Sequence, residues 1–305
     1  KRNAYYEGKP DKGIEHIMIT FGNQCNTACR ICNASRSSLI EKQYKAMTSS
    51  IDDPDLYKLV TKKHDWSKSK TWYRNIIDNI VARADSIRKL EISGGEPFIN
   101  VHFDRLIDAL LESGKQLPGL NITTNGSFTE EQIQKLEAFD HLHINYSIDG
   151  SGKNFYEYLR WPLKWNDTLE KIDILKKYPW ITCEFAIVPH NLNILNLADS
   201  IKFFKEYTNH QDRFKVGFSW LNGAPWYKLD NTPDSVRQQV KQQIKDIDLS
   251  KYTEEEQEQI IELYNMIAHA NNPSHKDMLQ SHVSMTDTYR TSNTWEIIGW
   301  NYESI

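Results

Sequence analysis

The sequence predicts an α/β fold, a partial (βα)6 barrel of the TIM-like type with a helical C-terminal extension. Six short strand-like runs alternate with helix-like stretches in the first two thirds of the 305 residues. This alternation is typical of a parallel sheet with right-handed crossovers. From residue 228 onward the sequence is mainly helical and has no further clear strand-like run. We therefore expect a barrel over residues 1–222 and a helical extension over residues 223–305.

The six predicted strands are short and bounded by turn residues. They lie at residues 16–22, 89–93, 120–125, 142–149, 181–188 and 215–221. Residues 71–89 repeat apolar side chains at helical spacing and predict a helix. Residues 48–70 are polar and irregular, which indicates an insertion or a lid.

Several helix starts are marked by capping residues. A Ser, Thr or Asp followed three residues later by Glu or Gln is typical of a capping box. The pairs are Thr129 with Gln132, Asp167 with Glu170, and Thr253 with Glu256. Thr232 followed by Pro233 also predicts a cap, with proline in the first turn.

The predicted strands alternate apolar and polar residues. A parallel sheet covered by helices on both faces is normally apolar on both, and a closed barrel fills its interior with branched aliphatic side chains. The alternation instead predicts a curved, open barrel whose concave face surrounds a polar ligand cavity. An ordinary sheet with a few buried polar residues is the alternative. The side chains expected to face the cavity are Glu91, His143, Asn145, Glu184 and Lys215.

Composition excludes several classes of protein. The formal net charge is −4 and the pI is about 6.2, which does not indicate nucleic-acid binding. No run approaches the roughly 18 apolar residues of a membrane helix, and no signal peptide is visible. Four cysteines in 305 residues do not make a secreted disulfide scaffold. We expect a cytoplasmic protein without nucleic-acid or membrane partners.

Three of the four cysteines are crowded together. Cys25, Cys29 and Cys32 form a C-x3-C-x2-C pattern after the first predicted strand. Structural zinc normally takes four ligands, and a disulfide would leave one of the three unpaired. A [4Fe–4S] cluster is held by cysteine thiolates, normally four, so three would leave one iron open. Arg30, beside the cysteines, is expected to offset their negative charge. Cys183, on the fifth strand, is expected to be a buried apolar side chain.

Four motifs lie in order, each at the carboxyl end of a predicted strand. They are C-x3-C-x2-C (25–32), SGGEP (93–97), TTNG (123–126) and SIDG (147–150). Active sites of barrels lie at these strand ends. In this order the motifs resemble those of radical SAM enzymes, and SIDG is similar to the branch that modifies peptides and proteins. The stretch TDTYRTSNTWEIIGW (286–300) resembles the C-terminal region of twitch-type members.

The resemblance implies two cofactors, a [4Fe–4S] cluster and S-adenosylmethionine (SAM). It implies that Cys25, Cys29 and Cys32 hold the cluster. Glu96 suits the amino group of SAM, and Ser147 with Arg160 suits its carboxylate. For several of these residues a structural alternative stays open: a strand-end turn for Gly94–Pro97 and for Thr123 and Asn125, a salt bridge for Arg160, and a core position for Val188. The SAM-binding residues that the resemblance implies are Ile31, Gly94, Gly95, Glu96, Pro97, Thr123, Asn125, Ser147, Asp149, Arg160 and Val188.

The implied activity is reductive cleavage of SAM to a 5′-deoxyadenosyl radical, which abstracts a hydrogen atom from a substrate. An external electron donor, flavodoxin or ferredoxin, is implied as a partner. The substrate class expected is a peptide or protein side chain. The alternatives are a radical SAM enzyme acting on a small molecule or nucleotide, and a non-catalytic metal-binding scaffold. Twitch and SPASM relatives usually carry further cysteines for an auxiliary cluster, and this sequence has none after Cys183.

Overall fold

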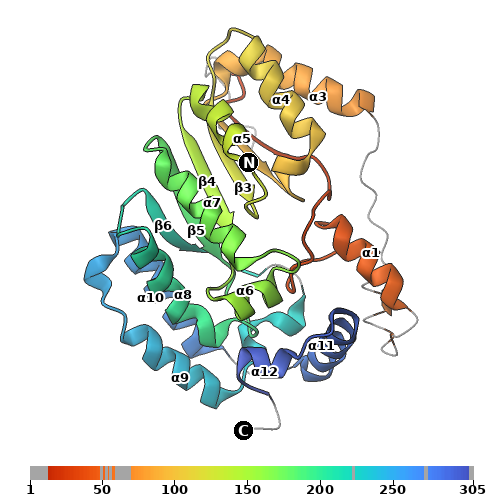
Figure 1. The fold of residues 1–305 in the computed structure, drawn as a ribbon, viewed down its shortest axis with the longest axis vertical. Helices are drawn as coiled ribbons and strands as arrows, with labels where there is room; N and C mark the ends of the chain where they lie inside the picture. Colours follow the sequence, from red (N-terminus) through yellow and green to blue (C-terminus); the bar gives the residue numbers. More distant parts are fainter. Residues whose placement is uncertain are drawn as a thin grey trace, which may run out of the picture.

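A six-stranded parallel sheet organises the molecule (Figure 1). The computed structural model describes residues 13–48, 51, 54, 57–58, 70–221, 224–270 and 274–301. The strands are β1 (His16–Thr20), β2 (Lys89–Ser93), β3 (Gly119–Thr124), β4 (Leu142–Ser147), β5 (Ile181–Ile187) and β6 (Phe214–Phe218). They pair in the order β1-β2-β3-β4-β5-β6, so the sheet is an open, partial barrel. The predicted α/β fold class is confirmed.

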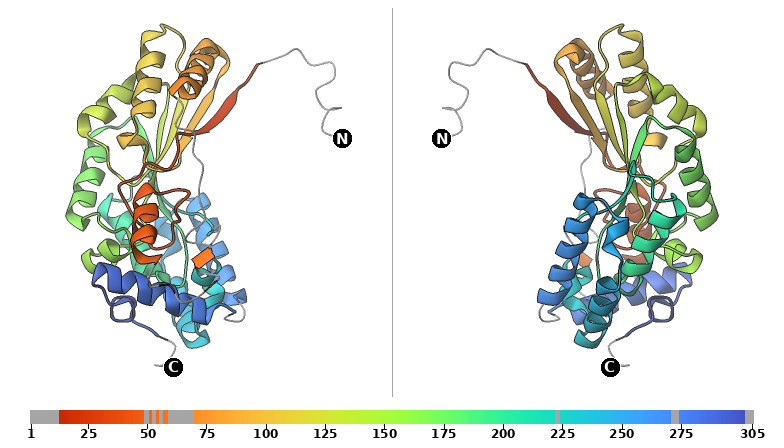
Figure 2. Two further views of the ribbon diagram at one scale, coloured as in Figure 1. Left: turned by 90° about the vertical axis from the view of Figure 1, so that its right-hand side faces the viewer. Right: turned by 90° about the vertical axis from the view of Figure 1, so that its left-hand side faces the viewer.

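The helices of the barrel follow the strands in turn. They are α1 (Ser38–Met47), α3 (Lys70–Ala82), α4 (Val101–Glu112), α5 (Glu130–Lys135), α6 (Lys153–Leu159), α7 (Trp165–Lys177) and α8 (Leu197–Tyr207). Figure 2 shows α4, α5 and α7, drawn in yellow to green, on one side of the sheet. Short 3-10 turns lie at Ala84–Ser86, Pro97–Ile99, Leu136–Ala138, Ile194–Asn196, Pro225–Tyr227, Leu229–Asn231 and Leu249–Lys251.

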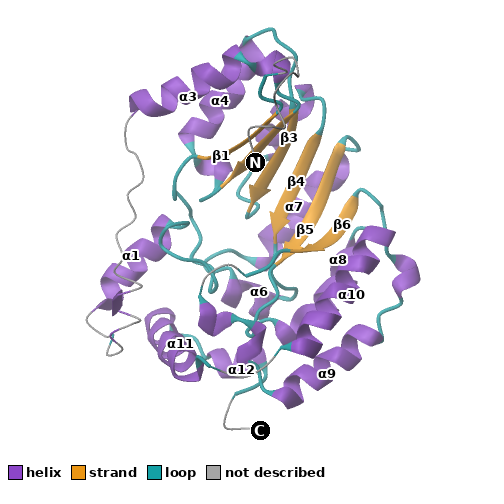
Figure 3. Cartoon of the chain, turned by 180° about the vertical axis from the view of Figure 1, so that it is seen from behind, coloured by secondary structure: helices purple, strands orange, loops and turns teal. Residues whose placement is uncertain are grey.

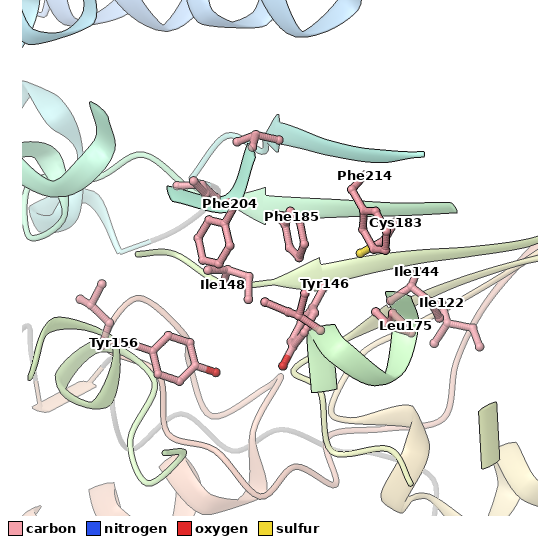
Figure 4. Packing of buried hydrophobic residues seen from close by; sticks show 14 of the residues in the cluster. Ile122, Ile144, Tyr146, Ile148, Tyr156, Leu175, Cys183, Phe185, Phe204 and Phe214 are labelled. Carbon is pink, nitrogen blue, oxygen red and sulfur yellow. The ribbon is translucent and has the colours of Figure 1, made fainter. Parts of the chain in front are cut away.

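The core lies between the sheet and these helices. Along β3 and β4 buried residues alternate with half-buried ones, as a strand with one buried face requires. Figure 4 shows Tyr146, Cys183 and Phe185 packed with Phe204 and Phe214. Cys183 is buried among these side chains, so its expected role as an apolar core residue is confirmed. The predicted polar face is confirmed by the same alternation.

The described residues after β6 are mainly helical. They form α9 (Asp234–Lys245), α10 (Glu254–His269), α11 (Lys276–Arg290) and α12 (Thr294–Ile298). One of these helices, α10, lies along the β6 edge of the sheet. On α10, Glu256 Oε1 accepts the backbone N–H of Val216 at 2.9 Å, and Gln259 Oε1 accepts that of Phe218 at 2.8 Å. An edge strand otherwise leaves such groups unpaired, so α10 closes this edge with side chains.

Several local predictions are settled. The capping boxes at Thr129 and Thr253 are confirmed. The box at Asp167 is wrong, because α7 begins at Trp165, whose N–H is accepted by Glu157 Oε1. Thr232 is not a cap either, since Pro233 directly precedes α9.

The remaining predictions concern the ends of segments. The helix expected over 71–89 is α3, which ends at Ala82, and residues 87–88 already lead into β2. The insertion or lid expected at 48–70 lies largely outside the described residues. No helix within the described ranges is long and apolar enough to cross a membrane.

Candidate active site at the carboxyl ends of the strands

A cavity of about 450 Å³ lies at the carboxyl ends of the strands. In Figure 3 the strand arrows point toward the part of the molecule that holds α1, α6 and α11. The cavity collects residues from the loop after β1 and from the ends of all the other strands except β6, whose following segment contributes Ser219–Leu221. The predicted site residues that line it are Cys25, Cys29, Ile31, Cys32, Gly94, Gly95, Thr123, Asn125, Ser147, Asp149, Arg160 and Val188.

The three loop cysteines are free thiols on one wall of this cavity. Thr27 Oγ1 lies 3.1 Å from Cys25 Sγ and 3.5 Å from Cys29 Sγ. Burial, followed by the charge of Cys29, raises the pKa of Cys25 and raises the pKa of Cys32 to about 12. The thiols of Cys25 and Cys32 are therefore protonated near neutral pH until a metal ion displaces the protons.

The cysteine loop is held by the ends of β2 and β3. Glu96 N donates to Gln24 O at 2.8 Å, and Asn125 Nδ2 donates to Asn26 Oδ1 at 3.0 Å. Gly95 has φ +57°, and a Cβ there would lie 2.3 Å from Gln24 O. Only glycine fits this close approach, which explains one glycine of the SGGEP segment.

Glu96 and Pro97 are predicted site residues that do not line the cavity. Glu96 is 0% exposed, and its carboxylate accepts Thr124 Oγ1 at 2.7 Å, Asn125 N at 2.7 Å and Phe98 N. Burial raises the pKa of Glu96 to about 7 against these hydrogen bonds. The carboxylate therefore ties the end of β2 to that of β3. Its contact with the amino group of SAM stays a prediction.

Arg160 lies between an acid and a thiol. Its Nε is 3.4 Å from Asp149 Oδ2, and its Nη1 donates to Cys29 Sγ at 3.0 Å. Burial lowers the pKa of Arg160, but Asp149 and Cys29 outweigh burial and raise it above its ordinary value. The surface salt bridge considered for this arginine is excluded, because the side chain is buried.

Three buried polar atoms of the cavity lining have no hydrogen-bond partner among the described residues. They are Arg160 Nε, which faces Asp149 at 3.4 Å, Arg160 Nη2, a cationic donor, and Asn145 Oδ1, an acceptor. Buried polar groups are almost always paired. An unpaired donor next to Cys29 fits a ligand carboxylate, and an unpaired acceptor fits a ligand N–H or O–H. The unpaired donor beside the thiols therefore fits the carboxylate of a ligand such as SAM, and the acceptor on β4 is left for a donor group of a second ligand.

Arg30 corrects one prediction. It was expected to offset the charge of the thiolates, but its side chain points to the other side of the loop. Nη2 donates to Asp287 Oδ1 at 2.6 Å and to Ser292 Oγ at 2.8 Å, and Nη1 contacts Thr286 Oγ1. The reason is the carboxylate on α11, which compensates the buried charge. Arg160 takes the expected place beside Cys29.

The residues expected on the concave face divide into two groups. Of the five, Asn145 lines the cavity, and the expectation is wrong for Glu91, His143, Glu184 and Lys215, which are not among the lining residues. Glu91 pairs with Lys89 and His16, His143 contacts Thr182, and Lys215 pairs with Glu255. Thr27, Asn33 and Arg36 also line the cavity and were not predicted. These three residues lie inside or just after the cysteine pattern, and this position in the sequence could have predicted that they line the cavity.

The arrangement of the thiols bears on the choice of metal. Within the described part of the chain, no three His, Cys, Asp or Glu side chains are grouped so that they could hold one metal ion. A structural zinc ion needs ligands that converge on a point, whereas the thiolates of a [4Fe–4S] cluster bind separate irons. The cavity wall offers three thiols, whereas a structural zinc ion normally takes four ligands.

The sequence comparison decides the family. A family model described as the radical SAM superfamily matches residues 19–204, more than half of the chain. The chain belongs to the radical SAM superfamily. This is a family of enzymes that use a [4Fe–4S] cluster and SAM. The match covers the sheet from β1 to β5 and all four motifs of the loops.

Curated relatives of this radical SAM protein are distant. It is 22% identical over 189 residues to a probable GTP 3′,8-cyclase of Methanocaldococcus jannaschii, covering 62% of this chain and 52% of the relative. It is 25% identical over 144 residues to a GTP 3′,8-cyclase of Clostridium acetobutylicum, covering 46% and 36%. The chain spans about half the length of the first curated relatives that it matches.

Solved structures show the same fold. The radical SAM protein resembles a histidine-tagged form of "anSMEcpe with bound AdoMet" with a TM-score of 0.52 and 16% identity, covering 76% of this chain and 59% of that one. It resembles "Native anSMEcpe with bound AdoMet and Cp18Cys peptide" with a TM-score of 0.50 and 14% identity, covering 77% and 59%. The twitch-like character of the C-terminal helices stays a prediction.

Proposed function

We propose that Cys25, Cys29 and Cys32 hold a [4Fe–4S] cluster and that SAM binds in the cavity beside it. The proposal rests on one observation: the cavity brings together the three thiols and an unpaired guanidinium nitrogen of Arg160. When bound, the cluster supplies the electron that cleaves SAM and so starts radical chemistry. Flavodoxin or ferredoxin is the electron donor that we propose.

The residues of the chain orient this chemistry. Arg160 holds the carboxylate of SAM through Nη2, while Asp149 holds the guanidinium at Nε. Ser147 and Thr123 reach the same ligand from β4 and β3. Asn125 is engaged with the cysteine loop and with Ser127 Oγ at 2.6 Å, so its main part is to shape the turn. Val188 and Ile31 give apolar contacts to the adenine.

We propose a peptide or protein side chain as the substrate. Arg36 and Arg160 are the cationic side chains in the described lining of the cavity, and Arg160 is already beside Asp149 and Cys29. A nucleoside triphosphate needs more positive charge than this. A peptide places no such demand on the site. The likeness to a peptide-bound structure supports the same class, although it shows the fold alone.

A nucleotide substrate is the second candidate, because the curated relatives are named GTP 3′,8-cyclases. The test is incubation of the reduced, cluster-loaded protein with GTP and SAM, followed by mass spectrometry. Conversion of GTP would replace the peptide proposal. Unchanged GTP, together with SAM cleavage, would support it.

Anaerobic reconstitution tests the cofactor proposal. The wild type is expected to bind iron and sulfide, and to form 5′-deoxyadenosine with SAM and dithionite. The Cys25/Cys29/Cys32→Ala variant is expected to lose both properties. Cys183→Ala is the matched control, because it removes a thiol from the core and not from the loop. Equal iron and sulfide in all three proteins would overturn the proposal.

The barrel and the C-terminal helices are best treated as two parts of one enzyme. We propose that residues 1–222 carry the radical chemistry and that residues 223–305 cap the barrel and shape access to it. We also propose a cytoplasmic location. The contacts of α10 with β6 and of α11 with the cysteine loop support the capping role.

A further inference from the structure

Glu184 lies on the concave face of the sheet, on β5, two residues before Ala186, which lines the cavity. In the register of the sheet it pairs with Asn145 of β4 and with Lys215 of β6. A Cβ on Gly217 would lie 2.2 Å from Glu184 Cδ. The carboxyl group therefore lies over Gly217, which is nearer to the carboxyl end of the sheet than Lys215. The side chain leans toward the cavity.

The neighbouring charges leave Glu184 without a counter-ion. Lys215 Nζ is 2.5 Å from Glu255 Oε2, and Lys205 Nζ is 2.6 Å from Glu256 Oε2. Both nearby lysines thus pair with other acids. For Glu184 the structure gives neither an ion pair nor a hydrogen bond within the described residues. Burial and Glu255 together raise the pKa of Glu184, as expected for a carboxylate that lacks compensation.

The cavity begins beside this carboxylate. Ala186 lines it and is the register partner of Gly217, so two small residues leave space above the Glu184 carboxyl group. Asn145, the register partner of Glu184, also lines it, and Asn145 Oδ1 is buried with no partner. One acceptor, Asn145 Oδ1, therefore lines the cavity, and a second, charged acceptor lies next to it in the register of the sheet. The ligand that satisfies both is a cationic hydrogen-bond donor.

We propose that Glu184 recognises a cationic side chain of the substrate, the ammonium of a lysine or the guanidinium of an arginine, with Asn145 accepting a second hydrogen bond. This rests on the proposed function, since it names the class of peptide residue that enters the site. Glu184 and Asn145 stand on the β5 and β4 side of the cavity, away from the cysteine loop. The substrate therefore lies across the cavity from the thiols.

Peptide binding tests this directly. Four pools of hexapeptides with a fixed central residue, Lys, Arg, norleucine or Glu, are titrated into the SAM-loaded protein and followed by ligand-observed NMR. The Lys or Arg pool is expected to bind at least about tenfold more tightly than the norleucine pool, since a hydrogen bond to a charged group is lost in the latter. The Glu pool is expected to bind most weakly.

Two variants assign the preference to one carboxylate. Glu184→Gln is expected to abolish the difference between the cationic and norleucine pools. Glu91→Gln is the matched control, because Glu91 is on the same face but pairs with Lys89 and His16; it should keep the preference. Wild-type protein that prefers neither Lys nor Arg would overturn the proposal, as would a Glu184→Gln variant that keeps the preference.

The two proposals fail in different ways. Iron and sulfide content, and 5′-deoxyadenosine formed without peptide, report on the cluster and on SAM. A wild-type protein that holds no iron and sulfide and forms no 5′-deoxyadenosine contradicts the proposed function, regardless of the results of the peptide titrations. Normal values in wild type and in Glu184→Gln, with equal binding of all four pools, contradict the substrate proposal alone.

Discussion

The outer side of the cysteine loop, where Arg30 contacts α11, and the concave face of the sheet use polar side chains in opposite ways. On the outer side, both terminal nitrogens of Arg30 are taken by residues of α11 and the turn after it. On the concave face, Asn145 Oδ1 is buried without a hydrogen-bond partner in the described structure, and the half-buried Glu184 carboxylate forms no ion pair there. Partners within the chain indicate a role in stability, and missing partners indicate a ligand. Substitutions should therefore separate the two regions.

The largest effect is expected at Asp287. Asp287→Ala leaves the guanidinium of Arg30, which is 1% exposed, as a buried charge without a counter-ion. Breaking such a pair costs about 3–5 kcal/mol of unfolding free energy. Urea denaturation measures this loss of unfolding free energy. Asp234→Ala is the control, since its pair with Arg237 uses an aspartate that is 71% exposed; equal losses in both variants would refute the comparison.

A somewhat smaller loss is expected at Glu96. Glu96→Ala removes the acceptor of three buried donors, on Thr124, Asn125 and Phe98. Orphaned donors of this kind should cost roughly 2–4 kcal/mol in total. Thermal denaturation of the apoprotein measures this loss of stability without any cofactor present. A variant as stable as the wild type would mean that the carboxylate faces a ligand, as the sequence first suggested.

The outer side should also respond to acid. Both ring nitrogens of His282 form hydrogen bonds: Nε2 with the hydroxyl of Tyr44 on α1, and Nδ1 with the hydroxyl of Tyr227. Burial, Arg30 and Arg290 lower its pKa to about 3 from 6.5. As the pH falls, His282 in the unfolded chain takes up a proton near pH 6.5, whereas His282 in the folded protein stays neutral until about pH 3. The free energy of unfolding therefore decreases as the pH drops below 6.5. The expected loss from His282 is about 2 kcal/mol between pH 6.5 and pH 5.

Urea melts at several pH values measure this slope. His282→Gln cannot take up the proton and should flatten it, whereas the exposed His269→Gln should not. His190, whose pKa is also lowered to about 3 by burial and Arg160, leaves a residual slope in the His282 variant. An unchanged slope in His282→Gln would contradict this account.

The smallest effect on stability is expected at Glu184. Glu184→Gln removes a carboxylate that is repelled by Glu255 and Glu256 and attracted by Lys215, and it breaks no hydrogen bond or ion pair within the described residues. The unfolding free energy should stay within about 1 kcal/mol of the wild type or rise. A loss as large as that of Asp287→Ala would show that Glu184 belongs with the stabilising residues and would remove the contrast.

The sequence predicts the sheet and most of the cavity because both follow from short-range patterns. The alternation in β3 and β4 marks the buried face, and the motifs fall at strand ends, where a parallel fold gathers them. This is why Ser147 and Arg160, though distant from Cys29 in sequence, could be expected beside it, and both line the same cavity.

The directions of individual side chains could not be predicted in the same way. Arg30 is next to Cys29 in sequence, but its partner is on α11, and no local pattern encodes that contact. Glu96 stands in a motif that indicates a ligand, yet the donors around it come from β3 and from its own turn. Long-range partners, and not spacing, decide where a charged side chain points.

The ion pair between Arg30 and Asp287 has a consequence for how the protein is made. The two residues are 257 positions apart, so the ribosome releases the cysteine loop long before it has synthesised α11. At typical rates the interval is roughly 10 to 50 seconds. During that time the loop lacks the carboxylate that holds its arginine. The cysteine loop therefore reaches its final arrangement only after α11 has been synthesised, and the three thiols stay outside their final surroundings until then.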